Sequence, residues 1–208
     1  MQSKDAIKRG VYGRIRIWDR DEVTGALIPR FQQFNQIQAT WGYIAAQQIG
    51  FKRPSGRLDY SIAAMYFEYE NVVNAEDPVT VPTYEVDEGL SYYDELGDSA
   101  DRDFLRIPLS QEPTLGIESE FEDLFTPGLD GNKLTFSAQT AGLTGVHGKE
   151  FSNDVNSKLF GVALVATPVA DDRTQDVIFA RTYFAVDDQV VKALSHQAFI
   201  QWDIVFLP

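Results

Sequence analysis

The stretch from Ala198 to Phe206 alternates between two sets of side chains, and this alternation constrains the fold more than any other feature of the sequence. One set is apolar (Ala198, Ile200, Trp202, Ile204 and Phe206), whereas the other is mixed (Phe199, Gln201, Asp203 and Val205). Successive side chains of a β-strand point to opposite faces, so a period of two is typical of a strand with one buried face. The sequence therefore predicts that this segment is a half-buried strand.

The same alternation recurs along the chain and predicts a mainly β fold. Besides 198–206, strands are expected at residues 11–18, 26–34, 61–69, 104–109, 133–138, 159–167 and 177–184. The run 159–167 is apolar without alternation, which is typical of a strand that is buried on both faces. Eight or nine short strands separated by turn residues favour a single domain over residues 1–208, built as an antiparallel β-sandwich or jelly-roll-like body.

Two segments interrupt this strand pattern. Asn35 is a favourable N-cap for one short helix over 36–49, and Gly50 ends that helix. Residues 74–103 lack a clear period and combine two prolines and two glycines with many acids, which predicts a long acidic loop or insertion. The tyrosines within it favour packing against another surface over full disorder.

Composition excludes several classes of protein. The chain has no cysteine, which excludes thiol catalysis, cysteine-ligated zinc and disulfides. No run approaches the ~18 apolar residues of a membrane span, and residues 1–9 lack the apolar core of a signal peptide. We therefore expect a soluble protein that is made in a cytoplasm and has neither a membrane partner nor a cofactor.

The net charge of −13 is distributed unevenly along the chain. Residues 1–57 carry ten Lys and Arg against four Asp and Glu, 58–123 carry two against eighteen, and 124–208 carry six against nine. An acidic whole disfavours nucleic acid as a partner. Segments of opposite sign favour an association in which unlike surfaces of neighbouring copies meet. The simpler interpretation, a solvated acidic loop, stays open.

The expected interface pairs two arginines with the acidic loop. Arg14 and Arg16 lie on the basic face of the first predicted strand, and we expect them to be exposed and to contact the 85–103 segment of a neighbouring copy or partner. The residues expected on the acidic side are Tyr84, Asp87, Glu88, Tyr92, Tyr93, Asp94 and Glu95. In the alternative interpretations these tyrosines stack on a carbohydrate, with or without calcium, or pin the loop onto the body.

Motifs for metal binding or catalysis fail on their spacing. Asp19-x-Asp21 begins like a calcium loop, but Thr24 stands where that loop needs glycine and Arg30 where it needs glutamate. The glycine-rich stretch 142–149 lacks the first glycine of a phosphate loop and the hydroxyl that follows its lysine, so we expect a flexible loop. A hydrolase built on either of the two histidines would need a nucleophile and an acid that no motif supplies.

The C-terminal third resembles the ending of certain tailed-bacteriophage virion proteins. The matching residues are the strand 177–184 with its aromatic-Ala-Arg-x-x-Phe pattern, then Lys192, then the closing strand around Trp202. The N-terminal region is similar in its strand pair followed by Asn35 and a short helix. This chain lacks the glycine that the family tends to have after Met65, and its acidic loop has no counterpart there.

The resemblance implies a non-enzymatic structural component of a phage virion. It implies a place in the tail, neck or baseplate, in multiple copies that contact each other and other virion proteins as a homo-oligomer. Such a protein is made in the host cytoplasm and resides in the virion. Two alternatives stay open: a carbohydrate- or receptor-binding module of a phage fibre, and a capsid decoration protein.

Overall fold

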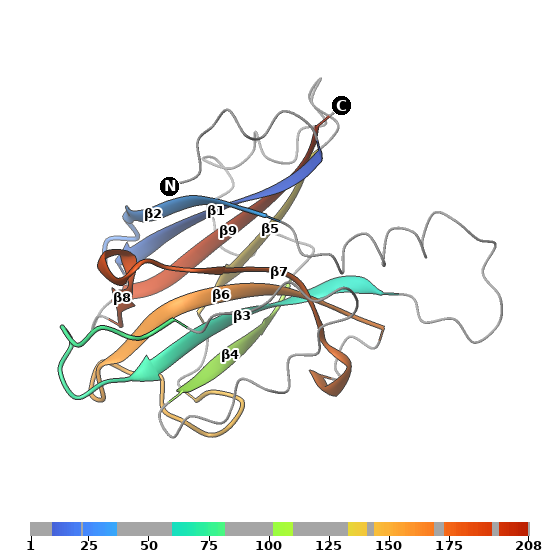
Figure 1. Ribbon diagram of the computed structural model, residues 1–208. Coiled ribbons are helices and arrows are strands. Elements are labelled where there is room, and N and C mark those ends of the chain that lie inside the picture. Colours follow the sequence, from blue (N-terminus) through green and yellow to red (C-terminus); the bar gives the residue numbers. More distant parts are fainter. Residues whose placement is uncertain are drawn as a thin grey trace.

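The computed structural model describes residues 10–21, 23–36, 60–81, 102–109, 133–140, 144–168, 173–192 and 196–207. Within these ranges the chain is mainly β, as predicted, and its strands form two antiparallel sheets (Figure 1). The helix expected at 36–49 lies outside the described residues apart from Gln36, which ends a strand. Residues 82–101, most of the expected acidic loop, also lie outside them.

Sheet A has four strands in the order β2-β1-β9-β5. Their bounds are β1 Gly10–Asp21, β2 Leu27–Gln36, β5 Lys133–Gln139 and β9 His196–Leu207. The β1–β2 hairpin turns at Asp21, whose carboxylate accepts the backbone N–H groups of Val23 and Thr24 at 2.8 Å. β9 lies at the centre of the sheet because it pairs with β1 on one side and with β5 on the other.

Pro29 lies within β2, which continues on both sides of it. A register shift between Ile17 and Trp18 absorbs the irregularity, since Ile17 pairs with Phe31 whereas Trp18 pairs with Pro29. Among the described strands, β2 has a partner on one side, which is the edge position where a missing backbone donor is tolerated.

Sheet B has the order β4-β3-β6-β7, and a short strand β8 also pairs with β6. The bounds are β3 Ser61–Asn71, β4 Arg102–Pro108, β6 Ser157–Thr167, β7 Val177–Tyr183 and β8 Val190–Val191, with 3₁₀ turns η4 Arg173–Gln175 and η5 Val186–Asp188. β6 is buried at every position, as its apolar run predicts. β4 begins at Arg102, so the last two residues of the expected acidic loop belong to a strand.

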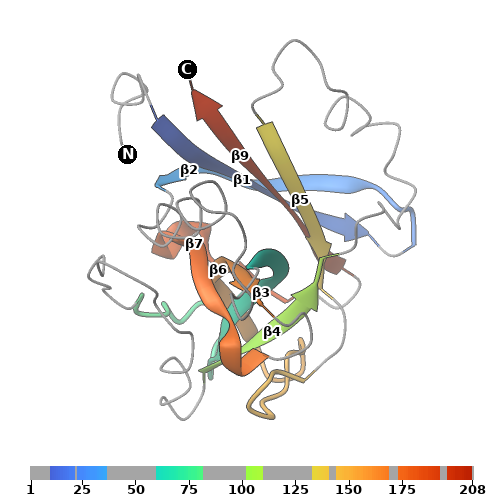
Figure 2. The ribbon, with the colours of Figure 1, turned by 90° about the vertical axis from the view of Figure 1, so that its right-hand side faces the viewer.

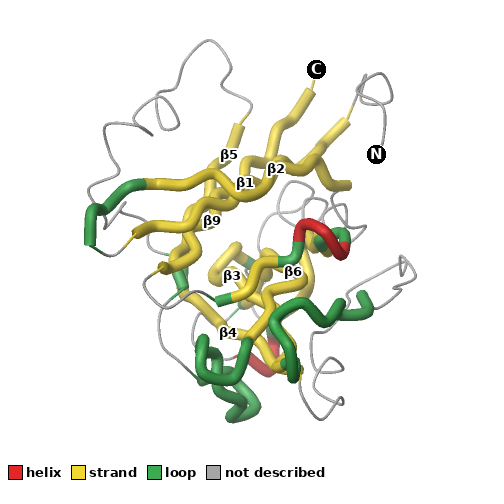
Figure 3. The backbone as a smooth tube through the Cα atoms, turned by 90° about the vertical axis from the view of Figure 1, so that its left-hand side faces the viewer, coloured by secondary structure: helices red, strands yellow, loops and turns green. Residues whose placement is uncertain are grey.

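The inner faces of the two sheets share one apolar core. Sheet A contributes Ile15, Ile17, Ile200, Trp202 and Ile204, and sheet B contributes Met65, Phe67, Tyr69, Leu164 and Phe179, among others. Figures 2 and 3 show the sheets as two layers, with β4 close to β5 at one side of the molecule and β2 close to β7 at the other. Apolar area removed from water between these layers stabilises the fold by roughly 25 cal/mol per Å².

β9 departs from the predicted half-buried strand, because both of its faces are buried from Ala198 to Ile204. Trp18 of β1 packs against Phe199 on the outer face, with ring centroids 5.8 Å apart. Arginine side chains of β1 reach across to Asp203 on the same face. The period of two is correct, but the burial of the polar set depends on long side chains of the neighbouring strand.

Candidate interaction face on the four-stranded sheet

Four polar side chains form a compact cluster on the outer face of sheet A. Arg14 lies opposite Asp203 and Arg16 opposite Gln201, because β1 and β9 pair in antiparallel register. Their sequence neighbours Ile15 and Trp202 point into the core, and residues two apart in a strand share a face, so all four project outward. We name these four residues, Arg14, Arg16, Gln201 and Asp203, the arginine face.

One carboxylate serves both guanidinium groups of the arginine face. Nε of Arg14 donates to Oδ2 of Asp203 at 2.9 Å, and Nη2 of Arg14 donates to the same oxygen. Nη2 of Arg16 donates to this oxygen at 3.1 Å. The Asp203 side chain is fully buried, whereas those of Arg14 and Arg16 are 30% and 21% exposed. In this cluster the Asp203 carboxylate is therefore buried, and the two arginines that contact it are partly exposed to solvent.

Among the described residues, two cations of the arginine face share one anion, so its charges do not balance. Burial lowers the pKa of Arg16; the attraction of Asp203 raises it, the repulsion of Arg14 lowers it further, and the net direction is downward. Carboxylates form short, charge-assisted and often bidentate hydrogen bonds with guanidinium groups. A second carboxylate beside Arg14 and Arg16 would relieve the repulsion between them.

The arginine face also retains unused hydrogen-bonding capacity. Among the described residues, Nε of Arg16 has no acceptor and Oε1 of Gln201 has no donor, although both atoms are buried. Nε2 of Gln201 donates to Oδ1 of Asp203 at 3.2 Å, which fixes the amide beside the carboxylate. A buried polar atom without a partner costs about 1–3 kcal/mol, so these two atoms carry a desolvation cost within the cluster.

Aromatic side chains extend the arginine face towards the β1–β2 hairpin. The guanidinium carbon of Arg16 lies 5.5 Å from the ring centroid of Trp18, and Trp18 in turn packs on Phe199. A cation over an indole ring contributes about 0.5–1 kcal/mol at an exposed site. Tryptophan and arginine are also the residue types that are enriched at the energetic centres of protein interfaces.

The structure describes two of the residues predicted at the interface, Arg14 and Arg16. They are half-buried and paired within their own chain, not freely exposed as expected, because β9 brings Asp203 into register with β1. The remaining predicted residues, Tyr84, Asp87, Glu88, Tyr92, Tyr93, Asp94 and Glu95, lie outside the described residues. Their contact with the two arginines stays a prediction.

The outer face of sheet B carries a different arrangement, in which charged residues form separate pairs. Nε of Arg106 donates to Asp176 at 2.8 Å, and Nε of Arg181 lies 3.3 Å from Oε1 of Glu68. Arg102 of β4 forms a third pair with Glu70 of β3. Only the third pair joins neighbouring strands, because Glu68 of β3 and Arg181 of β7 are separated by β6, and Asp176 precedes β7 whereas Arg106 lies on β4. The same face carries a small apolar cluster: Ala64, Tyr66, Phe104, Ala163, Val165 and Ile178.

Tyr66 belongs to the same network as Arg106. Its hydroxyl donates to the buried carboxylate of Asp176, and its ring stacks on Phe104 with centroids 4.4 Å apart. Burial raises the pKa of Tyr66 well above its ordinary value, and Asp176 raises it further. Tyr66 is therefore held as a neutral hydrogen-bond donor.

Asp103 of β4 holds the backbone of the loop 144–150. Its buried carboxylate accepts three backbone N–H groups, those of Phe104 at 2.8 Å, His147 at 3.0 Å and Lys149 at 2.8 Å. The Tyr69 hydroxyl donates to the carbonyl oxygen of Lys149 at 2.9 Å. The expectation of a flexible loop is therefore wrong for its described part, because a carboxylate from a distant strand holds the backbone.

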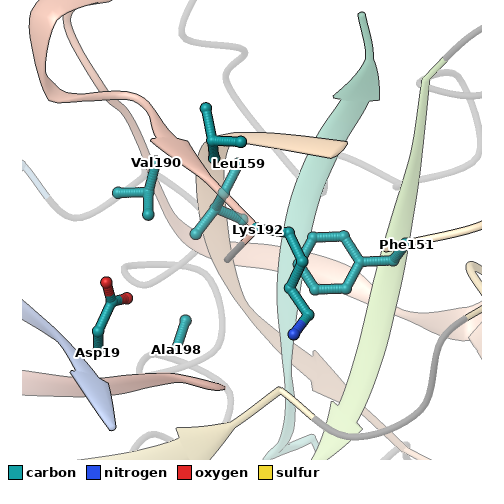
Figure 4. Close-up of a pocket in the computed structure, with 7 residues that line it drawn as sticks. Asp19, Phe151, Leu159, Val190, Lys192 and Ala198 are labelled. Carbon is teal, nitrogen blue, oxygen red and sulfur yellow. The ribbon is translucent and has the colours of Figure 1, made fainter. Parts of the chain in front are cut away.

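A small pocket lies between the sheets near the β1–β2 hairpin. Figure 4 shows Val190 and Leu159 on one side of it and Asp19 and Ala198 on the other. Its cavity of about 10 Å³ has room for about one water molecule. The Asp19 carboxylate accepts a hydrogen bond from Nε of Arg30 at 2.6 Å. This pocket is too small for an organic ligand.

Comparison of the chain with protein-family models, with curated proteins and with solved structures finds no match. Within the described ranges, no group of three or more His, Asp or Glu side chains could hold a metal ion. No helix in those ranges has the length and apolar character needed to cross a membrane. The arginine face combines an excess of one positive charge with two partly exposed guanidinium groups, and guanidinium groups bind carboxylates through charge-assisted hydrogen bonds.

Proposed function

We propose that this protein is a non-enzymatic structural component of a tailed-phage virion, in the tail, neck or baseplate, and that it assembles in multiple copies. In this proposal the chain is one antiparallel β-sandwich or jelly-roll-like domain, and its partners are copies of itself and other virion proteins. The observation that carries the proposal is the arginine face, where two partly exposed guanidinium groups share one buried carboxylate. Such a surplus of positive charge on a chain of net charge −13 favours contact with an acidic copy of the same chain.

The positions of the residues that resemble phage virion proteins support a framework role. Ala180 and Phe184 are buried in the shared core, and Arg181 pairs with Glu68 on the outer face of sheet B. Trp202 is the largest of the fully buried side chains in the described part of the chain. A core and paired outer face of this kind make a rigid body, which suits a part that holds its neighbours at fixed distances.

The oligomeric state in solution tests the self-assembly part of this proposal. We expect size-exclusion chromatography with light scattering to detect oligomers at low salt and high protein concentration, and these oligomers should dissociate at high salt because charges hold them together. A monomer under both conditions would contradict self-assembly.

The virion part of the proposal is tested by the genes on either side. Neighbouring genes for a portal, a sheath or a tape-measure protein would support a structural part of the particle. Neighbouring genes for enzymes of one metabolic route would contradict it.

A further inference from the structure

We propose that the arginine face binds the acidic end of a second copy of this chain, so that copies associate end to face. The acidic end consists of three described loops, 72–80, 152–156 and 185–189, with the acids Glu76, Asp77, Asp154, Asp187 and Asp188. This inference rests on the proposed function and adds to it the partner and the two surfaces that meet.

Hydrogen bonds join the three loops of the acidic end into one surface. The backbone N–H of Val79 donates to Oε1 of Gln189 at 3.0 Å, and Nε2 of Gln189 donates to the carbonyl of Val79 at 2.8 Å. Nδ2 of Asn156 donates to the carbonyl of Val73 at 3.1 Å. These loops follow β3 and β7 and precede β6, so they lie together at one end of sheet B, at the left of Figure 1.

The acidic end exposes apolar side chains among its carboxylates. Val73 is 86% exposed and Val186 is 51% exposed, and they are two of the four large hydrophobic residues that the described part of the chain exposes. The side chains of Glu76, Asp154, Asp187 and Asp188 are exposed as well. Lys158 is close to these loops, but it is buried, and its Nζ donates to the backbone carbonyl oxygen of Asp77 at 2.9 Å. Its charge therefore does not face the exposed carboxylates.

The two surfaces complement each other in charge and in apolar character. A carboxylate of the acidic end would supply a second anion, which Arg14 and Arg16 lack within the described part of the chain, and it would accept hydrogen bonds from guanidinium groups. The exposed valines would pack beside Trp18, whose ring carries the Arg16 guanidinium. Because different surfaces of one chain meet, the contact is heterologous, and repetition of such a contact builds rings or filaments of many copies.

Neutralising each surface separately tests the contact. R14Q/R16Q/D203N removes the charges of the arginine face together, so that no buried carboxylate is left alone, and D187N/D188N changes exposed side chains of the acidic end. Sedimentation velocity at low salt should show both variants as monomers where the unchanged protein associates, with a loss of affinity of at least about tenfold, equivalent to about 1.4 kcal/mol. Arg173→Gln, which removes an exposed arginine outside both surfaces, is the matched control and should associate like the unchanged protein.

Mixing the two variants gives the sharpest readout. The arginine-face variant keeps its acidic end, and the acidic-end variant keeps its arginine face, so an equimolar mixture should form one-to-one heterodimers and nothing larger. Circular dichroism melting curves verify that each variant is folded, and the exposed positions of D187N/D188N make that variant informative even if the triple variant unfolds.

Three outcomes would overturn the inference. If the unchanged protein associates and D187N/D188N associates equally well, the acidic end is not the partner, although self-assembly still holds. If only the arginine-face variant loses association, the partner is another acidic segment, with residues 84–95 as the first to test. If mixing the two variants gives no heterodimer, the contact is not heterologous. A monomeric unchanged protein would instead contradict the proposed function itself.

Discussion

The outer faces of the two sheets shift the pKa of an arginine side chain in opposite directions. On sheet B, Arg106 has the Asp176 carboxylate as its partner; burial alone lowers the pKa of Arg106, but Asp176 raises it above its ordinary value. On sheet A, Arg16 shares Asp203 with Arg14, and burial lowers its pKa below the ordinary value. The charged form of arginine is therefore favoured at Arg106 on sheet B and disfavoured at Arg16 on sheet A.

This difference distinguishes a framework from the surface that we propose to bind a second copy. Each of the three ion pairs described on sheet B joins one arginine to one carboxylate: Arg102 to Glu70 on neighbouring strands, and Arg106 to Asp176 and Arg181 to Glu68 across the sheet. The arginine face of sheet A keeps one positive charge in excess and leaves both guanidinium groups partly exposed. Substitutions on the two faces should accordingly have different consequences for stability.

The largest effect is expected for Asp176→Asn on sheet B. This change removes the carboxylate that pairs with the largely buried Arg106 and weakens the bond from the Tyr66 hydroxyl, which should lower the free energy of unfolding by about 3–5 kcal/mol. Urea denaturation followed by circular dichroism measures the loss. Asp154→Asn, at an exposed position, is the control and should change stability by less than about 0.5 kcal/mol. A loss below about 1 kcal/mol in Asp176→Asn would show that the pair is not a framework element.

Asp203→Asn on sheet A should cost less, about 2–3 kcal/mol, because Arg14 and Arg16 can turn their exposed ends towards water. The remaining repulsion between two partly exposed cations is screened by salt. We therefore expect high salt to recover part of the loss for Asp203→Asn but not for Asp176→Asn. Equal salt responses of the two variants would contradict the distinction between the faces.

Gly145→Ala should lower stability by about 2 kcal/mol, because the new Cβ would overlap the Asp103 carboxylate and the Tyr69 hydroxyl. Gly148→Ala is the matched control in the same loop. It meets no neighbouring atom within 4 Å but has φ +88°, so it should cost about 1 kcal/mol through backbone strain. Faster amide exchange at His147 and Lys149 in Gly145→Ala, and little change in Gly148→Ala, would locate the effect at Asp103.

The smallest effect concerns alkaline pH. Above pH 10 the unfolded chain releases the phenolic proton of Tyr66 whereas the folded protein keeps it, because burial and Asp176 raise its folded-state pKa. The unfolded state then binds fewer protons, so the free energy of unfolding falls by about 1.4 kcal/mol per pH unit for this group. Tyr66→Phe should be less stable at neutral pH but should show a shallower alkaline decline. Parallel declines in the two proteins would refute this assignment.

The sequence predicts the strands well, because their period is local. β3 and β6 follow the expected boundaries closely, and the alternation around Trp202 identifies the core side of β9. Pro29 is less predictable, since the register shift that accommodates it involves the partner strand β1. Local pattern therefore gives the elements but not the irregularities of their pairing.

The candidate site is less predictable than the fold, for the same physical reason. Arg14 and Arg16 are recognisable as one basic face of a strand, but their carboxylate partner lies 189 and 187 residues away and meets them only in register. Asp103 looks like one more acid of an acidic segment until the loop 144–150 is placed against it. A pattern of residue types cannot identify partners that only tertiary pairing selects.

The central position of β9 has a consequence for synthesis of the protein on the ribosome. The β1–β2 hairpin and β5 both hydrogen-bond to β9, and β9 follows all of them in the sequence. The arginine side chains of β1 therefore emerge from the ribosome long before Asp203 is translated. Until translation reaches β9, the β1–β2 hairpin and β5 are not joined into one sheet. A chaperone or another protein that binds the nascent chain would then contact the edges of β1 and β5 that β9 later covers.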